Sequence, residues 1–111
     1  MKIDFNDIQP SVLQNFQGGQ GQLVSRRYQD GNNKIGFALL TPGSSIGMHA
    51  HVTSSEIIFV ISGEGKMTLG DGSVETLHAG DCHYCPKGGS HSLANEGTED
   101  LIFRAVVPEH K

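Results

Sequence analysis

The sequence has no apolar run that approaches the ~18 residues needed to span a membrane as a helix. It also has no block of basic residues, and its formal net charge is -4. Nucleic acids and anionic membrane surfaces attract basic proteins, so we expect neither as a partner. Residues 1–7 contain acids and amides where a signal peptide has apolar residues, which favours a cytoplasmic protein.

Cysteine is scarce. The chain has two, Cys82 and Cys85, in a C-x-x-C pattern that also occurs in redox and zinc sites. The pattern lies in a stretch that we expect to be extended, where three steps of about 3.3 Å put the two Cα atoms about 10 Å apart on opposite faces. A disulfide needs Cα atoms within about 7 Å of each other. We therefore expect two reduced thiols that pack on a strand.

A chain of 111 residues has room for one domain. Fifteen glycines, closely spaced turn signals and short apolar runs predict an all-β domain without a long helix. The expected strands cover residues 23–28, 35–40, 48–51, 56–61, 66–69, 74–77, 82–85, 91–95 and 101–107. Nine short strands of this kind predict a double-sheet barrel of the jelly-roll type.

Residues 1–22 precede the predicted barrel, which spans residues 23–111. Apolar residues in this segment fit neither a helix nor a strand, Pro10 interrupts it, and residues 17–22 resemble a flexible joint. Two alternatives stay open. The segment is either an arm that pairs with the sheet of another subunit or a cap on its own barrel.

The predicted strand 56–61 is apolar on both faces. Alternation places Glu56, Ile58 and Val60 on one face, and the opposite face consists of apolar residues only: Ile57, Phe59 and Ile61. If the face with Glu56 points inward, the other face needs cover from the N-terminal segment or from a partner. A chain this short buries only about 60 to 68% of its unfolded surface, which leaves surface for a partner. We favour a homodimer.

Two separate segments carry the groups of a metal site. The first contains Gly43, His49, His51, Glu56 and Gly63, and the second contains Gly80, Pro86, Gly88, His91 and Asn95. His49 and His51 are two apart on a predicted strand, so they project from the same face. Glu56 and His91 can then close a shell of three nitrogens and one oxygen around a transition metal.

The run from Gly43 to Gly63 resembles the first cupin motif without a departure, and the run from Gly80 to Asn95 resembles the second. With the stretch between them, the two runs cover residues 43–95. The resemblance implies a small β-barrel that holds a metal inside, with the ligands His49, His51, Glu56 and His91. It does not imply one reaction, because this fold hosts many.

The same resemblance implies one divalent transition metal, and members of the family accept Mn, Fe, Zn, Ni or Co. Four protein ligands leave up to two positions on an octahedral ion for water or substrate. Structural zinc sites commonly contain thiolate, which this set lacks, so we expect an ion that is open to a ligand. Asn95 belongs to the motif, and we expect it to hold backbone groups rather than substrate.

Two residues are candidates for a catalytic proton carrier beside the ion. His83 shares a face with Cys85, and if that face points inward, His83 can exchange protons near neutral pH close to the metal. Tyr84 lies on the opposite face and takes this place if the parity is reversed. A solvent-exposed His83 is the remaining alternative.

Arginines are candidates for a grip on a substrate carboxylate. Arg26 and Arg27 are adjacent and point opposite ways, so we expect one of them to face inward, and Arg104 lies in the last strand. Tyr28 has the parity of Arg26 and would line the same wall. The candidate substrate-binding residues are therefore Arg26, Tyr28 and Arg104, with Arg27 as the alternative to Arg26.

These features favour a metal-dependent cupin that acts on a small polar molecule bearing a carboxylate. Isomerase, lyase or decarboxylase chemistry, which needs a proton carrier, ranks slightly ahead of dioxygenase chemistry, which needs a redox metal. One alternative is a non-catalytic module that binds or senses a small ligand through its metal. A metal with a purely structural role is the third reading.

Overall fold

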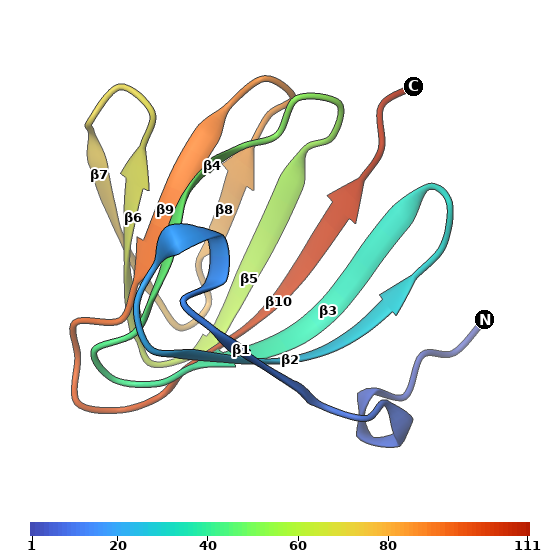
Figure 1. The fold of residues 1–111 in the computed structure, drawn as a ribbon, viewed down its shortest axis with the longest axis horizontal. Coiled ribbons are helices and arrows are strands. Elements are labelled where there is room, and N and C mark those ends of the chain that lie inside the picture. The colour runs from blue at the N-terminus through green and yellow to red at the C-terminus, as the bar shows by residue number, and fades with distance from the viewer.

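The computed structural model describes residues 1–111, which form ten strands and two 3-10 turns (Figure 1). The larger of two antiparallel sheets has the strand order β1 (Ser11–Gln14), β2 (Gln22–Gln29), β3 (Asn33–Leu40), β10 (Leu101–Pro108), β5 (Glu56–Ser62) and β8 (Cys82–Cys85). The smaller sheet has the order β4 (Ser45–Ala50), β9 (Ser90–Ala94), β6 (Glu64–Leu69) and β7 (Val74–His78). The all-β jelly-roll prediction is confirmed.

All nine strands expected from the sequence are present, with ends that differ by a few residues. Strand β1 is an addition that the sequence pattern did not predict. The only helical elements are the short turns η1 (Phe5–Asp7) and η2 (Phe16–Gly18). No helix in the structure is both long and apolar enough to cross a membrane.

The two sheets do not close into the predicted barrel, because no strand ladder joins one sheet to the other. At one seam the chain before β2 lies along β4. Ser45 donates its N–H to the Gln20 carbonyl at 2.8 Å, and its hydroxyl accepts the Gln20 N–H at 3.0 Å. Gly47 lies so close to the Gln17 carbonyl that a Cβ atom would collide with it. A loop therefore covers this seam in place of a strand pair, and the sandwich stays open.

The hydrophobic core lies between the two sheets. Leu40 and Leu101 of the larger sheet and Met67 of the smaller sheet are fully buried there. Each such side chain contributes about 1.5–3 kcal/mol of hydrophobic stabilisation. Leu13 and Phe16 of the N-terminal segment pack against the same core. The core packs the two sheets face to face. Buried polar side chains lie on the same inner faces, beside the core.

Strand β5 follows the alternation expected from the sequence. Ile58 and Val60 are buried in the core, whereas Phe59 is 49% exposed and Ile61 is 40% exposed on the outer face of the larger sheet. Tyr84 of the neighbouring strand β8 is also exposed on this side, because it pairs with Ile57. The cysteines divide in the same way, with Cys82 exposed and Cys85 buried.

The N-terminal segment contacts its own chain on both sides of the larger sheet. Strand β1 pairs with β2 of the same chain, with Leu13 opposite Leu23. Turn η1 lies against the outer face, where the rings of Phe5 and Phe37 are 6.0 Å apart. Pairing of this segment with the sheet of another subunit, the alternative to a cap on its own barrel, stays a prediction.

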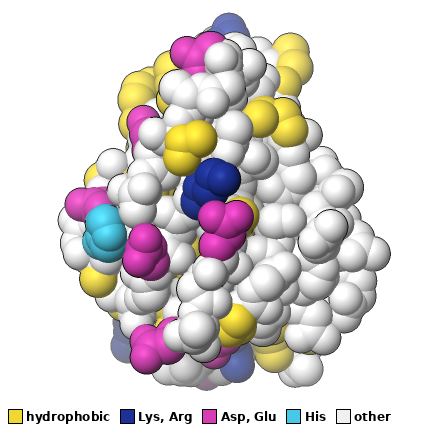
Figure 2. Space-filling model, turned by 90° about the vertical axis from the view of Figure 1, so that its left-hand side faces the viewer, with side chains coloured by type: hydrophobic (Ala, Val, Ile, Leu, Met, Phe, Trp, Pro, Cys, Tyr) yellow, Lys and Arg dark blue, Asp and Glu magenta, His cyan; other side chains and the backbone are white.

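Acidic side chains outnumber basic ones on the face formed by β6 and β7 (Figure 2). Glu64, Glu96 and Lys66 line a shallow hollow on this face. Lys66 and Glu96 form an exposed ion pair at 3.8 Å, and such pairs contribute little stability.

Candidate metal centre

The four predicted ligands come from strands that meet between the sheets. His49 lies in β4, His51 directly follows it, Glu56 begins β5, and His91 lies in β9. In the β4–β9 ladder His49 pairs directly with His91. Each of the four side chains offers one donor atom, and these atoms all lie within 4.8 Å of one another.

A β-bulge turns His49 toward this cluster. The register of β4 against β9 shifts between Ile46 and His49, so the alternation of faces is broken there. Ile46 and His49 are three apart, yet both line the same internal cavity. Gly47 lies within the bulge, where its lack of a side chain also lets the η2 loop approach.

The donor atoms of the cluster face one another at short range. Glu56 Oε1 lies 2.8 Å from His91 Nε2 and 3.2 Å from His51 Nε2. The two Nε2 atoms of His51 and His91 are 3.1 Å apart, and both rings are buried. Two imidazole nitrogens and a carboxylate oxygen thus converge on one point, and a cation bound there would replace the protons that join the rings to the carboxylate.

The second nitrogen of each ring is already engaged. His49 Nδ1 donates to the Gly47 carbonyl at 2.8 Å, which leaves its Nε2 free to bind. His51 Nδ1 lies 3.0 Å from the Ser54 hydroxyl, and His91 Nδ1 lies 3.0 Å from His83 Nε2. Partners of this kind fix the orientation of metal-ligating histidines.

The environment favours the protonation states that a metal requires. Burial opposes ionisation of Glu56, but hydrogen bonds with His51 and His91 outweigh it and lower the pKa of Glu56 from 4.5 to about 2. Burial also lowers the pKa of His49 from its usual 6.5, which favours the neutral ring. Three imidazoles and one carboxylate fit Mn, Fe, Zn, Ni or Co.

Two small cavities adjoin the cluster. One of about 50 Å³ is lined by His49, Glu56 and His91 together with apolar residues such as Phe16 and Phe103. A water needs roughly 10–15 Å³ of such space, so this cavity suits a molecule of a few heavy atoms. The second, of about 100 Å³, has Phe16, Glu56 and Phe103 in its lining as well, and extends to Arg27 and Lys34.

The candidate substrate residues lie elsewhere. Arg26 donates from Nη1 to the carbonyls of Ile8 at 2.9 Å and Phe5 at 3.3 Å. It lines a hollow with Arg104 on the outer face of the larger sheet. The Tyr28 hydroxyl donates to Asp30 at 3.1 Å. Their contact with a substrate stays a prediction.

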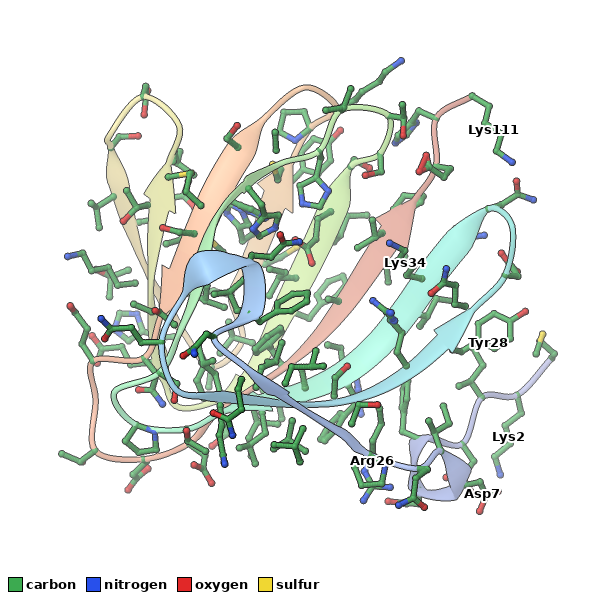
Figure 3. All side chains as sticks on the ribbon, in the orientation of Figure 1. Lys2, Asp7, Arg26, Tyr28, Lys34 and Lys111 are labelled. Atoms are coloured by element: carbon green, nitrogen blue, oxygen red, sulfur yellow. The ribbon has the colours of Figure 1, made fainter.

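Two cations lie on the inner side instead. Arg27, the alternative to Arg26, and Lys34 both line the larger cavity, and neither forms a hydrogen bond or ion pair in the structure. Figure 3 shows Arg26 close to the N-terminal turn and Lys34 on the other side of the sheet. Lys34 is not among the substrate-binding candidates expected from the sequence. The alternation of β3 does indicate the face on which Lys34 lies, because Lys34 shares that face with the buried residues Ala38 and Leu40.

The two candidate proton carriers lie on opposite faces of β8. His83 is buried and contacts His91, but it is not among the residues that line the two cavities. Tyr84 is 60% exposed on the outer face. A catalytic role for either residue stays a prediction.

Comparisons with known proteins agree with this architecture. A family model described as a cupin domain matches residues 36–107, which include the whole cluster. The oxalate-binding protein of Thermotoga maritima is 33% identical over 113 residues, covering 96% of this chain and 93% of that protein. Oxalate decarboxylase of Bacillus subtilis is 32% identical over 99 residues, covering 84% of this chain and 26% of the decarboxylase.

The fold also matches a solved structure over its whole length. The crystal structure described as a predicted oxalate decarboxylase from Thermotoga maritima superimposes with a TM-score of 0.90 at 30% identity. The match covers 98% of this chain and 99% of that chain. The strands that carry the four clustered side chains thus belong to an architecture that both chains share.

Proposed function

This chain belongs to the cupin family, and we propose that it binds a small dicarboxylate of the oxalate class at a metal ion held by His49, His51, Glu56 and His91. One observation carries the proposal: the four donor atoms lie within 4.8 Å of one another beside a cavity of about 50 Å³. Relatives named for oxalate binding and oxalate decarboxylation support this choice of ligand.

The site would offer a positive charge to each of the two carboxylates of such a ligand. A bound divalent ion would polarise a carboxylate oxygen placed next to it. Arg27 and Lys34 lie at the outer end of the larger cavity, where they offer unpaired positive charge to a second carboxylate. Phe16, Ile46 and Phe103 line both cavities and make the space between these charges apolar. The metal itself is one of Mn, Fe, Zn, Ni or Co.

Binding without turnover is the form that the geometry supports best. Apart from the cluster, the only titratable side chains that line the two cavities are Arg27 and Lys34. Neither is a histidine or a carboxylic acid, the side chains that most often carry the proton in general acid–base catalysis. Decarboxylation, in which oxalate and a proton give formate and carbon dioxide, is the second candidate, because a relative carries that name.

Titration of oxalate into metal-loaded and chelated protein, followed by calorimetry, tests the proposal. We expect saturable binding at one site with manganese present and at least about 100-fold weaker binding after chelation. Acetate, which has one carboxylate, should bind more weakly than oxalate. Equal oxalate affinity with and without metal would contradict the proposal. Release of formate would establish turnover in place of simple binding.

Arg27→Ala should weaken oxalate binding by about tenfold. A charge-assisted hydrogen bond contributes about 1.5–3 kcal/mol, each 1.4 kcal/mol is a factor of ten, and the exposure of Arg27 favours the lower end. Arg104→Ala is the matched control, because Arg104 lies on the outer face of the sheet and we expect no change. Loss of affinity in Arg104→Ala alone would place the ligand on that outer face.

We also propose a homodimer formed through the outer face of β5 and β8. Phe59, Ile61 and Tyr84 are exposed there, and β8 is an edge strand of the larger sheet. An exposed apolar patch on an open edge favours association with a second copy.

Phe59→Asp should convert the dimer to a monomer, measured by light scattering after size exclusion. Val74→Asp, on the smaller sheet, should not. A monomeric wild-type protein would overturn this proposal.

A further inference from the structure

His83 is a buried histidine that neither cavity uses. Its side chain is 2% exposed, and it points from β8 into the space between the sheets. Both of its ring nitrogens have partners. Nε2 lies 3.0 Å from Nδ1 of the cluster residue His91, and Nδ1 lies 2.7 Å from Oε1 of Glu75 in β7. Three side chains from three strands therefore form one continuous hydrogen-bonded chain.

The position of one proton fixes the direction of the whole chain. When His91 binds a cation through Nε2, the neutral ring carries its proton on Nδ1 and donates it to His83 Nε2. His83 must then carry its own proton on Nδ1, from which it donates to the Glu75 carboxylate. A neutral histidine has one ring proton, so no other arrangement satisfies both contacts. This hydrogen-bonded chain therefore ends on the negative charge of the Glu75 carboxylate.

We propose that Glu75 and His83 are positioning residues that fix the tautomer of His91 and strengthen its binding to the metal. This inference depends on the metal binding proposed above. A carboxylate behind a ligating histidine raises the basicity of that ligand, and here His83 extends the connection by one ring. Glu75 lies in the smaller sheet and His83 in the larger, so the contact also crosses the seam between β7 and β8.

A structural crosslink between the two sheets is the competing explanation. A crosslink would change the thermal stability of the protein but not the affinity or electronic structure of the metal. The distinguishing measurements are therefore the Kd for cobalt(II), obtained by competition with a chromophoric chelator, and the visible absorption spectrum of the cobalt-loaded protein. Neither measurement requires oxalate.

Glu75→Gln keeps the shape and the acceptor oxygen but removes the charge, and His83→Phe removes both hydrogen bonds. Outer partners of metal ligands typically contribute 10- to 100-fold to affinity, so we expect cobalt binding to weaken about 10-fold in Glu75→Gln and up to about 100-fold in His83→Phe. Both variants should also shift the cobalt absorption bands. Glu75 is partly exposed, so Glu75→Gln remains informative if His83→Phe fails to fold.

Glu64→Gln and His78→Phe are the matched controls. They alter a second histidine–glutamate pair, 4.0 Å apart and exposed, which does not contact the cluster. We expect their cobalt Kd and spectrum to equal those of the wild type. Unchanged Kd and spectrum in Glu75→Gln and His83→Phe, beside a wild type that binds cobalt, would overturn this inference alone. A wild type that binds no cobalt would overturn the proposed function as well.

Discussion

Replacing His91 with alanine should weaken metal binding by more than about 100-fold, because the loss of a ligand must exceed the 10- to 100-fold effect of an outer partner. His91 is 2% exposed and contacts Glu56, His51 and His83. Its removal leaves two imidazoles and one carboxylate, and it breaks the hydrogen-bonded chain to Glu75. Metal content after dialysis against a weak chelator, measured by mass spectrometry, checks the expectation.

His78→Ala is the control for this substitution. His78 is 63% exposed at the end of β7, so the His78→Ala protein should retain the metal at the wild-type level. Glu56→Gln should reproduce the loss seen in His91→Ala, because it preserves the size of the side chain and removes the anionic ligand. Retention of metal by both Glu56→Gln and His91→Ala would show that the ion binds elsewhere.

Asn95→Ala should lower the free energy of unfolding by about 3 kcal/mol, since each hydrogen bond contributes about 1 kcal/mol and an unpaired buried carbonyl costs about 1–3 kcal/mol. Asn95 is 1% exposed. Its Nδ2 donates to the carbonyls of Leu40 and Glu99, both at 2.8 Å, and its Oδ1 accepts the Gly97 N–H at 3.0 Å. The side chain thus joins the end of β3 to the turn before β10.

Thermal unfolding of the metal-free protein measures this effect. For a domain of this size, 3 kcal/mol corresponds to a fall in Tm of about 12–20 °C. Asn6→Ala, at an exposed asparagine whose side chain makes no hydrogen bond, should change Tm little. A fall of only a few degrees in Asn95→Ala would mean that water replaces the three bonds. The metal content should not change, because Asn95 does not contact the cluster.

Local patterns predicted most of the fold. Alternation and turn residues identified nine strands, and the outward face of β5 followed from parity. The role of Asn95 in holding backbone groups is also confirmed. Strand β1 was missed because it directly follows Pro10 and because its residues, Ser-Val-Leu-Gln, do not alternate between polar and apolar. The open seam was missed because no sequence pattern shows that a loop, rather than a strand, lies along β4.

The candidate site was also predictable from the sequence only in part. The spacing of the two motifs predicted that His49, His51, Glu56 and His91 would converge. The choice between Arg26 and Arg27 needed the structure, because both parities of β2 contain apolar residues and only packing shows which face points inward. The contact of Glu75 with His83 had no signal at all, since it crosses from one sheet to the other.

The metal content of the wild-type chain, purified without added metal and measured by elemental analysis, is the most direct test of a cation held by three imidazoles and one carboxylate. We expect about one transition-metal ion per chain, with loss on chelation and recovery on reloading. Absence of any ion, both as purified and after reloading with Mn, Fe, Zn, Ni or Co, would contradict it.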